Sequence, residues 1–229
     1  MTLKLYGVQG SQPFRAVLFL LKMKGIAFEE VFTMPGSKKE QPLGSKSKTF
    51  REMCPPGIVP VLEDSDAGLV LWESNAILTY IAAKHGMKDL YPTDFAQRAV
   101  VDQWLHWHHG NSRTFTMALF APVIRPDLEL SEQAIQDNKK RVAATAKLLE
   151  KQLEKTQYLC GDHLTLADIA VYEDIGQCQP HFCDLFDFSP YPALQRWMAT
   201  FEKLPSFEET HKVLAKLGKI FKKQKSSNL

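Results

Sequence analysis

Short apolar blocks separated by polar turns run through the first part of the chain. Residues 3–6 predict a strand, and from Pro13 apolar positions recur at i, i+3, i+4 and i+7 until Gly25, which predicts a helix. The segment FEEVFTM predicts a second strand. Because a strand, a helix and a second strand in one sheet are joined by a right-handed crossover, the pattern predicts a βαβ unit.

A polar, Lys/Ser/Gly-rich loop at residues 35–48 separates this unit from the next block of apolar positions. A short helical segment to Met53, two short strands at residues 60–63 and 69–72, and a helix at about residues 73–85 follow. The order of elements is therefore βαβαββα.

The rest of the chain, after the turn-rich segment GMKDLYPTD, contains no convincing strand. Helical patterns fill it at about residues 94–121, 131–156, 165–178, 190–202 and 206–222. We therefore predict an α/β plus all-α protein, with an α/β domain at residues 1–85 and an all-helical domain at residues 92–229.

Composition excludes several classes of protein. The chain has 229 residues, of which 45% are hydrophobic and 24% charged, as in an ordinary globular protein. No apolar run approaches the roughly 20 residues of a membrane span, and the first ten residues lack the pattern of a signal peptide, so we expect a cytoplasmic protein. The four cysteines form no Cys-x-x-Cys pair, which favours reduced thiols over disulfides or a zinc site.

The net charge of +2 conceals a basic C-terminal segment. Residues 211–229 hold six lysines and no acid, whereas the remaining 22 basic residues face 26 acids, a balance that does not favour a nucleic-acid partner. The segment fits a last helix with a solvated basic face, which we favour, or a membrane-surface helix. The terminal Ser227-Asn228-Leu229 is a near match to the peroxisomal address SKL, so a peroxisomal location is a minor alternative.

The turn in YGVQGSQPFRA, residues 6–16, could serve three kinds of chemistry. A phosphate-binding loop is excluded because Gly7 and Gly10 are too close together and no lysine follows them. A nucleophile elbow is excluded because Gln12 and Pro13 follow Ser11, where a glycine two residues on is needed. The remaining use is a hydroxyl at a helix start that holds an anion.

Two further segments suit a peptide ligand. GIVPV places Pro60 at the start of a strand, where a cis Val-Pro bond would turn the backbone of Val59 outward as a pairing edge. WESNAI places Glu73 and Ser74 at a helix start, where the hydroxyl and free amides favour a carboxylate and the acid can accept from an ammonium. Together with Ser11, these groups suit a short peptide that carries a thiol, an amine and a carboxylate.

Four motifs, SQPFRA, PPGIVPVL, ESNAIL and LTLADIAV, occur in this order along the chain. Together they resemble the signatures of the cytosolic glutathione transferases, and the serine before Gln-Pro is most similar to the theta class. The resemblance covers essentially the whole chain. It implies a thioredoxin-like first domain that binds glutathione and an all-helical second domain that supplies the electrophile pocket.

The resemblance also implies roles for individual residues. Ser11 would donate a hydrogen bond to the glutathione thiolate, and Arg113 would face the electrophile pocket. The implied glutathione-binding residues are Gln12, Gln41, Ile58, Val59, Pro60, Glu73 and Ser74. Family members often carry a histidine and a lysine where this chain has Gln41 and Ile58, so the residue that holds the glycyl carboxylate is left open, with Lys46 and Lys48 as candidates.

Other motifs receive structural interpretations. Thr165 and Asp168 in HLTLADI fit a helix-capping box. His106, His108 and His109 raise the possibility of a metal site, but only His106 and His109 share a helix face and no third ligand is in view. We expect no metal.

The expected function is conjugation of glutathione, as co-substrate, to small hydrophobic electrophiles by a homodimeric detoxifying transferase, with a possible peroxidase side activity. The alternative is a non-catalytic interaction or ligand-carrying protein of the same fold.

Overall fold

The computed structural model describes residues 3–125 and 128–227. The chain forms two units, Met1–His85 with Pro205–His211, and Gly86–Leu204 with Lys212–Leu229. The predicted fold class, a thioredoxin-like βαβαββα unit followed by a helical one, is confirmed.

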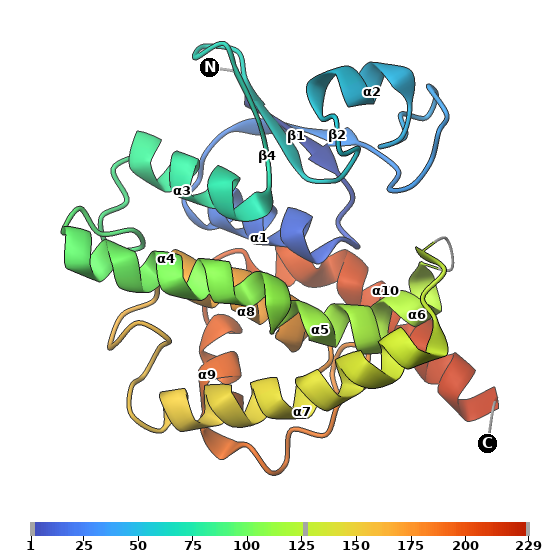
Figure 1. The fold of residues 1–229 in the computed structure, drawn as a ribbon. Helices are drawn as coiled ribbons and strands as arrows, with labels where there is room; N and C mark the ends of the chain where they lie inside the picture. Colours follow the sequence, from blue (N-terminus) through green and yellow to red (C-terminus); the bar gives the residue numbers. More distant parts are fainter. Residues whose placement is uncertain (1–2, 126–127, 228–229) are drawn as a thin grey trace. The chain divides into compact units, whose positions relative to one another are not determined.

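The first unit is built on a four-stranded mixed sheet in the order β2-β1-β3-β4 (Figure 1). Its elements are β1 Leu3–Gly7, α1 Gln12–Met23, β2 Phe28–Phe32, α2 Lys48–Met53, β3 Val61–Asp64, β4 Leu69–Trp72 and α3 Ser74–Lys84. Strand β1 pairs parallel with β2, whereas β3 pairs antiparallel with both β1 and β4. Helices α1 and α3 lie side by side (Figure 1).

The register of the sheet determines which loops meet. Gly7 faces Phe32 at the end of β2, Tyr6 faces Val61 at the start of β3, and Val61 in turn faces Trp72 at the end of β4. The loops that follow β1, β2 and β4, and the loop that precedes β3, therefore leave the sheet at the same end.

The start of the last helix, α10 Phe207–Ser227, belongs to the first unit. The rings of Phe207 and His211 lie edge-on to Phe19 of α1, with centroids 6.2 and 5.8 Å away. Lys22 also donates to Glu209 at 2.6 Å. Sequence reasoning had assigned this segment only to the helical domain.

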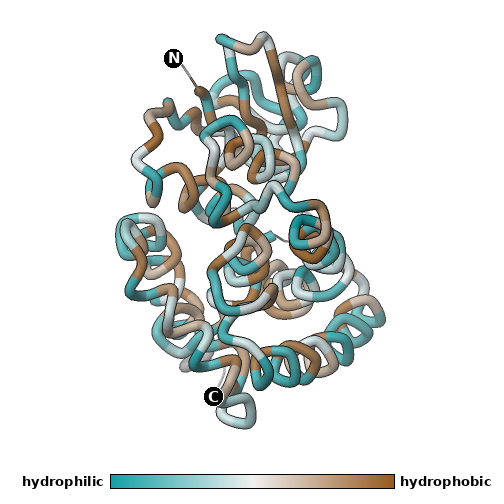
Figure 2. Tube along the Cα trace, turned by 90° about the vertical axis from the view of Figure 1, so that its left-hand side faces the viewer, coloured by the Kyte–Doolittle hydropathy of each residue, from teal (hydrophilic) through white to brown (hydrophobic). Residues whose placement is uncertain are grey.

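The second unit is helical. Its elements are α4 Phe95–Gly110, α5 Arg113–Phe115, the π-helix η1 Thr116–Phe120, α6 Ala121–Ile124, α7 Glu132–Leu153, α8 Leu166–Gly176, α9 Pro192–Phe201 and the rest of α10. Every residue of α8 is buried. Figure 2 shows hydrophobic and hydrophilic positions alternating along the helical turns of the chain. None of the helices in the described part of the chain is long and apolar enough to cross a membrane.

One predicted helix is wrong. The continuous pattern at 94–121 is broken after Gly110, and Asn111 leaves helical geometry with φ −125° and ψ −80°. Side chains hold the break, because Asn111 Nδ2 donates to the carbonyl of Trp107 at 2.8 Å and the Thr114 hydroxyl donates to the carbonyl of Asn111. Apolar periodicity alone does not register such local side-chain bonds.

The predicted capping box at the start of α8 is confirmed, and it extends into a buried network around Asp168. Its carboxylate accepts from the amide of Thr165 at 2.9 Å, from the amide of Leu159 at 2.8 Å and from Trp197 Nε1 at 3.0 Å. Burial raises the pKa of this carboxyl above its ordinary value even though these donors oppose the rise. The network joins α8, α9 and the loop before α8.

Replacing this buried acceptor should destabilise the second unit. In the Asp168→Ala variant the donors lose their partner, so the free energy of unfolding should fall by about 3 to 5 kcal/mol in urea titrations. Asp162→Ala, at an exposed position in the same loop, is the matched control and should change it by less than about 0.5 kcal/mol. Equal effects of the two substitutions would contradict this role of Asp168.

Candidate functional site

Ser11 is the N-cap residue of α1, with φ −85° and ψ 125°. Its amide donates to the carbonyl of Val8 at 2.9 Å and its carbonyl accepts from the amide of Arg15 at 2.9 Å, so the backbone is held on both sides. The half-buried side chain makes no capping hydrogen bond. Its hydroxyl therefore stands beside the free amides of a helix N-terminus and is available to an external anion.

Arg15, which is fully buried, fixes the turn before Ser11. This role was not predicted from the sequence. The Arg15 guanidinium donates to the carbonyls of Gln9 at 3.2 Å and Gly10 at 3.1 Å. A Cβ at Gly7, where φ is +155°, would lie 2.3 Å from the ring of Phe14, so only glycine fits there. The available signal was a charged residue on the apolar side of a predicted helix.

Gln12, the first residue of α1, is buried, with 4% of its surface exposed. The first-turn position of Pro13 costs the helix no hydrogen bond, because the first amides of a helix have no partner within it.

The Val59–Pro60 peptide bond is cis, as expected. Val59 is half-buried and packs with Ile58 against a cluster formed by Tyr6, Phe50 and Cys54. The antiparallel ladder between β1 and β3 begins at Val61, two residues later. The backbone of Val59 therefore lies beyond the last rung of the sheet, where an extended peptide can pair with it.

Glu73 and Ser74 form the start of α3. Glu73 has φ 74° and ψ 111°, a left-handed conformation that is costly for a residue other than glycine. Ser74, with 5% exposure, occupies the first helical position, and the first backbone bond of the helix runs from the amide of Ile77 to the carbonyl of Glu73 at 3.0 Å. The amides before Ile77 are the ones that a helix N-terminus offers to a carboxylate.

The register of the sheet brings these residues together. Ser11 follows β1, Val59 precedes β3 and Glu73 follows β4, and all three strand ends lie at the same end of the sheet. The structure therefore places a hydroxyl, a backbone edge and a helix N-terminus in one region of the first unit.

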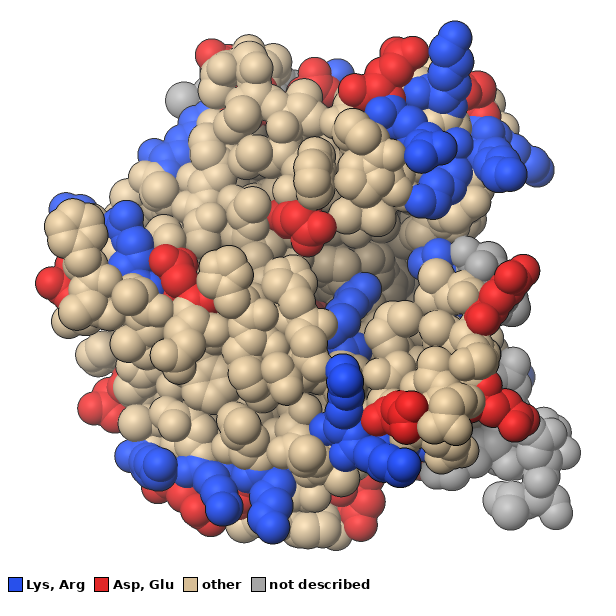
Figure 3. Space-filling model, in the orientation of Figure 1, with Lys and Arg blue, Asp and Glu red and all other residues tan. Residues whose placement is uncertain are grey.

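The loop after β2 carries Gln41 and several basic residues. Gln41 is exposed and precedes a cis bond to Pro42. Lysine and arginine side chains gather at the upper right of Figure 3, over the region of α2. Two of these basic residues bind the segment before Val59: Lys46 Nζ donates to the carbonyl of Pro56 at 2.8 Å, and Arg51 Nε donates to that of Pro55 at 3.3 Å. The backbone amide of Lys48 instead donates to Glu40 at 2.8 Å.

Arg113 belongs to the second unit, in α5, where its side chain is 32% exposed. Its Nη1 lies 3.2 Å from Oδ1 of Asp174, a carboxylate on α8 that is 1% exposed. Asp174 also binds Nε2 of His108 at 2.5 Å and accepts from the hydroxyl of Thr116. One buried carboxylate thus ties α4, α5 and the π-helix to α8, a role that sequence reasoning missed because its partners lie about 60 residues away.

The charge of Asp174 is maintained by its partners. Burial by itself would raise its pKa, but the charge of Arg113 and the bonds from His108 and Thr116 outweigh burial and lower the pKa to about 2. The carboxyl is therefore ionised throughout the neutral range, and Arg113 has a fixed anionic partner behind it.

This lowered pKa predicts acid sensitivity. The ordinary carboxyl pKa of the unfolded chain is about 3.9, so the stabilisation is present above about pH 4 and is lost as the pH falls towards 2. Urea titrations from pH 6 to 3 should show a loss of stability that is smaller, by about 1 kcal/mol, in Asp174→Asn than in the unsubstituted protein. Asp137→Asn on the exposed face of α7 is the control. Parallel pH profiles for Asp174→Asn and the unsubstituted protein would contradict the assignment.

Comparison with known proteins gives consistent matches for both units. Residues 1–83 match the N-terminal domain of glutathione S-transferases and residues 113–205 match the C-terminal domain. Glutathione S-transferase D7 of Anopheles gambiae is 34% identical over 86% of this chain and 85% of its own length. The theta-2 enzyme of Rattus norvegicus is 34% identical over 97% of this chain and 91% of its own length.

A solved structure supports the same relationship. The human theta-class glutathione transferase, in complex with the glutathione conjugate of 1-menaphthyl sulfate, superposes with a TM-score of 0.80 at 29% identity. The match covers 98% of this chain and 92% of the human chain.

Proposed function

The chain belongs to the glutathione S-transferase family, and we propose that the Ser11 hydroxyl activates the thiol of glutathione for attack on a small hydrophobic electrophile. The relatives and both domain matches make the protein a transferase that conjugates glutathione, not a non-catalytic module of the same fold. The observation that carries the proposal is the uncapped hydroxyl of Ser11 at the end of the sheet where Val59 and Ser74 also lie.

One hydroxyl at a helix start is energetically sufficient. Lowering a thiol pKa from about 8.5 to about 6.5 requires roughly 2.7 kcal/mol of preference for the thiolate. A hydrogen bond to a charged acceptor contributes about 1.5 to 3 kcal/mol, and a helix N-terminus about 0.3 to 1 kcal/mol. No separate general base is required, because the thiol proton can leave to water.

The reaction then follows from the position of the thiolate. The sulfur donates an electron pair to the electrophilic carbon, a carbon–sulfur bond forms, and the leaving group departs with the electrons of its own bond. Ser11 remains a hydrogen-bond donor and is not consumed.

The rest of glutathione is assigned by matching chemistry. The backbone of Val59, which lies beyond the last rung of the β1–β3 ladder, pairs with the cysteinyl unit of glutathione. Ser74 and the first amides of α3 bind the γ-glutamyl carboxylate, and Glu73 accepts from the γ-glutamyl ammonium. Gln12 and Ile58 flank these groups in the sequence.

Removing the hydroxyl should affect chemistry more than binding. Ser11→Ala should lower kcat by one to three orders of magnitude, about 1.4 to 4 kcal/mol, and leave the KM for glutathione within about twofold. Steady-state kinetics with an aryl halide measures both parameters. Ser11→Thr, which keeps a hydroxyl, is the matched variant and should retain most of the activity. Unchanged kcat in Ser11→Ala would refute the assignment.

The glycyl carboxylate requires a cation, and of the two candidate lysines the structure favours Lys46. Its ammonium lies on the Pro56 carbonyl, next to the segment that leads to Val59. Gln41 and Ile58 have uncharged side chains, so neither can supply the cation; Gln41 is exposed, and Ile58 packs in the apolar cluster.

Lys46→Met should therefore raise the KM for glutathione about tenfold with little change in kcat, because a charge-assisted hydrogen bond to the ground state is lost. Lys48→Met is the matched control, because Lys48 is two residues away and is also exposed. This substitution should change the KM for glutathione by less than about twofold. The reverse order of effects, or no effect of either change, would rule out Lys46.

The second unit supplies the electrophile site in this proposal, with Arg113 held by Asp174 as one of its polar groups. As a side activity, the same thiolate can attack a hydroperoxide oxygen, which releases the alcohol and leaves a sulfenic acid that a second glutathione converts to the disulfide with loss of water. We place the protein in the cytoplasm; of the proposed address at its end, Asn228 and Leu229 lie outside the described residues.

Pairing of two copies is also part of the proposal. Large apolar side chains are exposed on the second unit, among them Phe95 with 85% and Leu148 with 44% of their surface accessible. Leu148 lies beside Trp104 and Trp107 in a cavity of about 390 Å³ between α4 and α7. Exposed large apolar side chains of this kind support a homodimer.

A further inference from the structure

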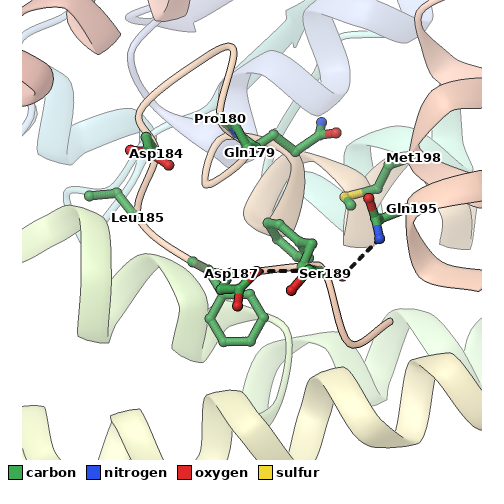
Figure 4. A pocket seen from close by; sticks show the side chains of 10 residues that line it. Gln179, Pro180, Asp184, Leu185, Asp187, Ser189, Gln195 and Met198 are labelled. Carbon is green, nitrogen blue, oxygen red and sulfur yellow. Dashed lines mark hydrogen bonds between the residues drawn. The ribbon is translucent and has the colours of Figure 1, made fainter. Parts of the chain in front are cut away.

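A second cavity lies wholly within the helical unit, between residues 179–189 and α9 (Figure 4). Its volume is about 500 Å³, within the range of small-molecule sites. It shares no residue with the proposed glutathione site, and neither the fold nor the transferase reaction explains it.

Half of the residues that line this cavity are apolar, and two of these are phenylalanines. Phe186 and Phe188 meet edge to face with centroids 4.8 Å apart, and Phe186 also meets Phe115 at 5.1 Å. Met198, which is 1% exposed, closes the side formed by α9. These contacts fix the rings, whereas Phe186 itself remains half-buried and accessible from the cavity.

The charge of the lining has one sign. Asp184 and Asp187 are its ionisable residues, and no lysine, arginine or histidine lines the described cavity. The amide of Ser189 donates to Asp187 at 2.9 Å, and the hydrogen bonds from Ser189 lower the pKa of Asp187 below its ordinary value. Asp187 is therefore charged at neutral pH.

The buried side-chain amide of Gln179 adds a hydrogen-bond acceptor to the lining of the cavity. Gln179 is 7% exposed, and its Nε2 donates to the hydroxyl of Tyr172 at 3.3 Å. In the described structure no hydrogen bond reaches its Oε1, although Gln179 lines the cavity. Figure 4 shows Gln179 and Asp184 on one side of the space and Asp187, Ser189 and Gln195 on the other.

We propose that this cavity is a second binding site, for a small organic cation with an apolar body, such as an aromatic quaternary ammonium. The aromatic walls take the apolar body and attract the cation through their ring faces. Asp187 neutralises the charge, and Gln179 accepts from any N–H that the ligand carries. Anions of the same shape are excluded because no base lines the cavity.

The test is a calorimetric titration of the whole protein with benzyltrimethylammonium. Phenylacetate, an anion of similar size, is titrated in parallel. We expect saturable binding of the cation alone. Asp187→Asn and Phe186→Leu should each weaken it about fivefold or more, and Asp162→Asn, at an exposed position of the same unit, should leave it unchanged.

Turnover of glutathione by each variant shows that it is folded and is expected to be unchanged, because neither position belongs to the proposed catalytic group. No saturable binding at millimolar cation overturns the proposal. Equal binding of phenylacetate, or equal affinity of the Asp187→Asn, Phe186→Leu and unsubstituted proteins, overturns it as well.

Discussion

The pairing of β1 with a parallel strand on one side and an antiparallel strand on the other is the constraint on which the site depends. Because β3 runs opposite to β1 and β4, its start lies where they end, so Ser11, Val59 and Ser74 lie at one end of the sheet although the first and the last are more than 60 residues apart in the chain. A slip of one residue in this register would invert the side chains of β3 and move the edge at Val59. Arg15 fixes the site locally, because its guanidinium donates to the carbonyls of the turn that precedes Ser11.

Two buried aspartates on α8, Asp168 and Asp174, differ in the direction of their pKa shifts and in their structural roles. Asp168 is surrounded by neutral donors, and burial raises its pKa. Asp174 has the charge of Arg113 beside it, and its pKa falls to about 2. The first stabilises the junction of α8 with α9, whereas the second fixes a partly exposed guanidinium near a π-helix. What distinguishes them is the charge of the partner, not the depth of burial.

The order of strands and helices, the fold class and the capping box at Thr165 could be predicted because each depends on periodicity or on residues a few positions apart. The break after Gly110 could not, because side chains of Asn111 and Thr114 replace helical bonds there. The roles of Arg15 and Asp174 depend on which distant groups the fold brings within reach. Lys46 and Lys48 are equal candidates in the sequence, and the bond of Lys46 to the Pro56 carbonyl could not be predicted from it.

If Ser11 makes the sulfur of glutathione the nucleophile, the pKa of the bound thiol must depend on the Ser11 hydroxyl. This pKa can be measured from the ultraviolet difference absorbance of the thiolate as the pH is raised. We expect ionisation well below the ordinary thiol value of about 8.5 in the unsubstituted protein, and a return to about that value in Ser11→Ala. Identical titration curves for the two proteins would contradict it.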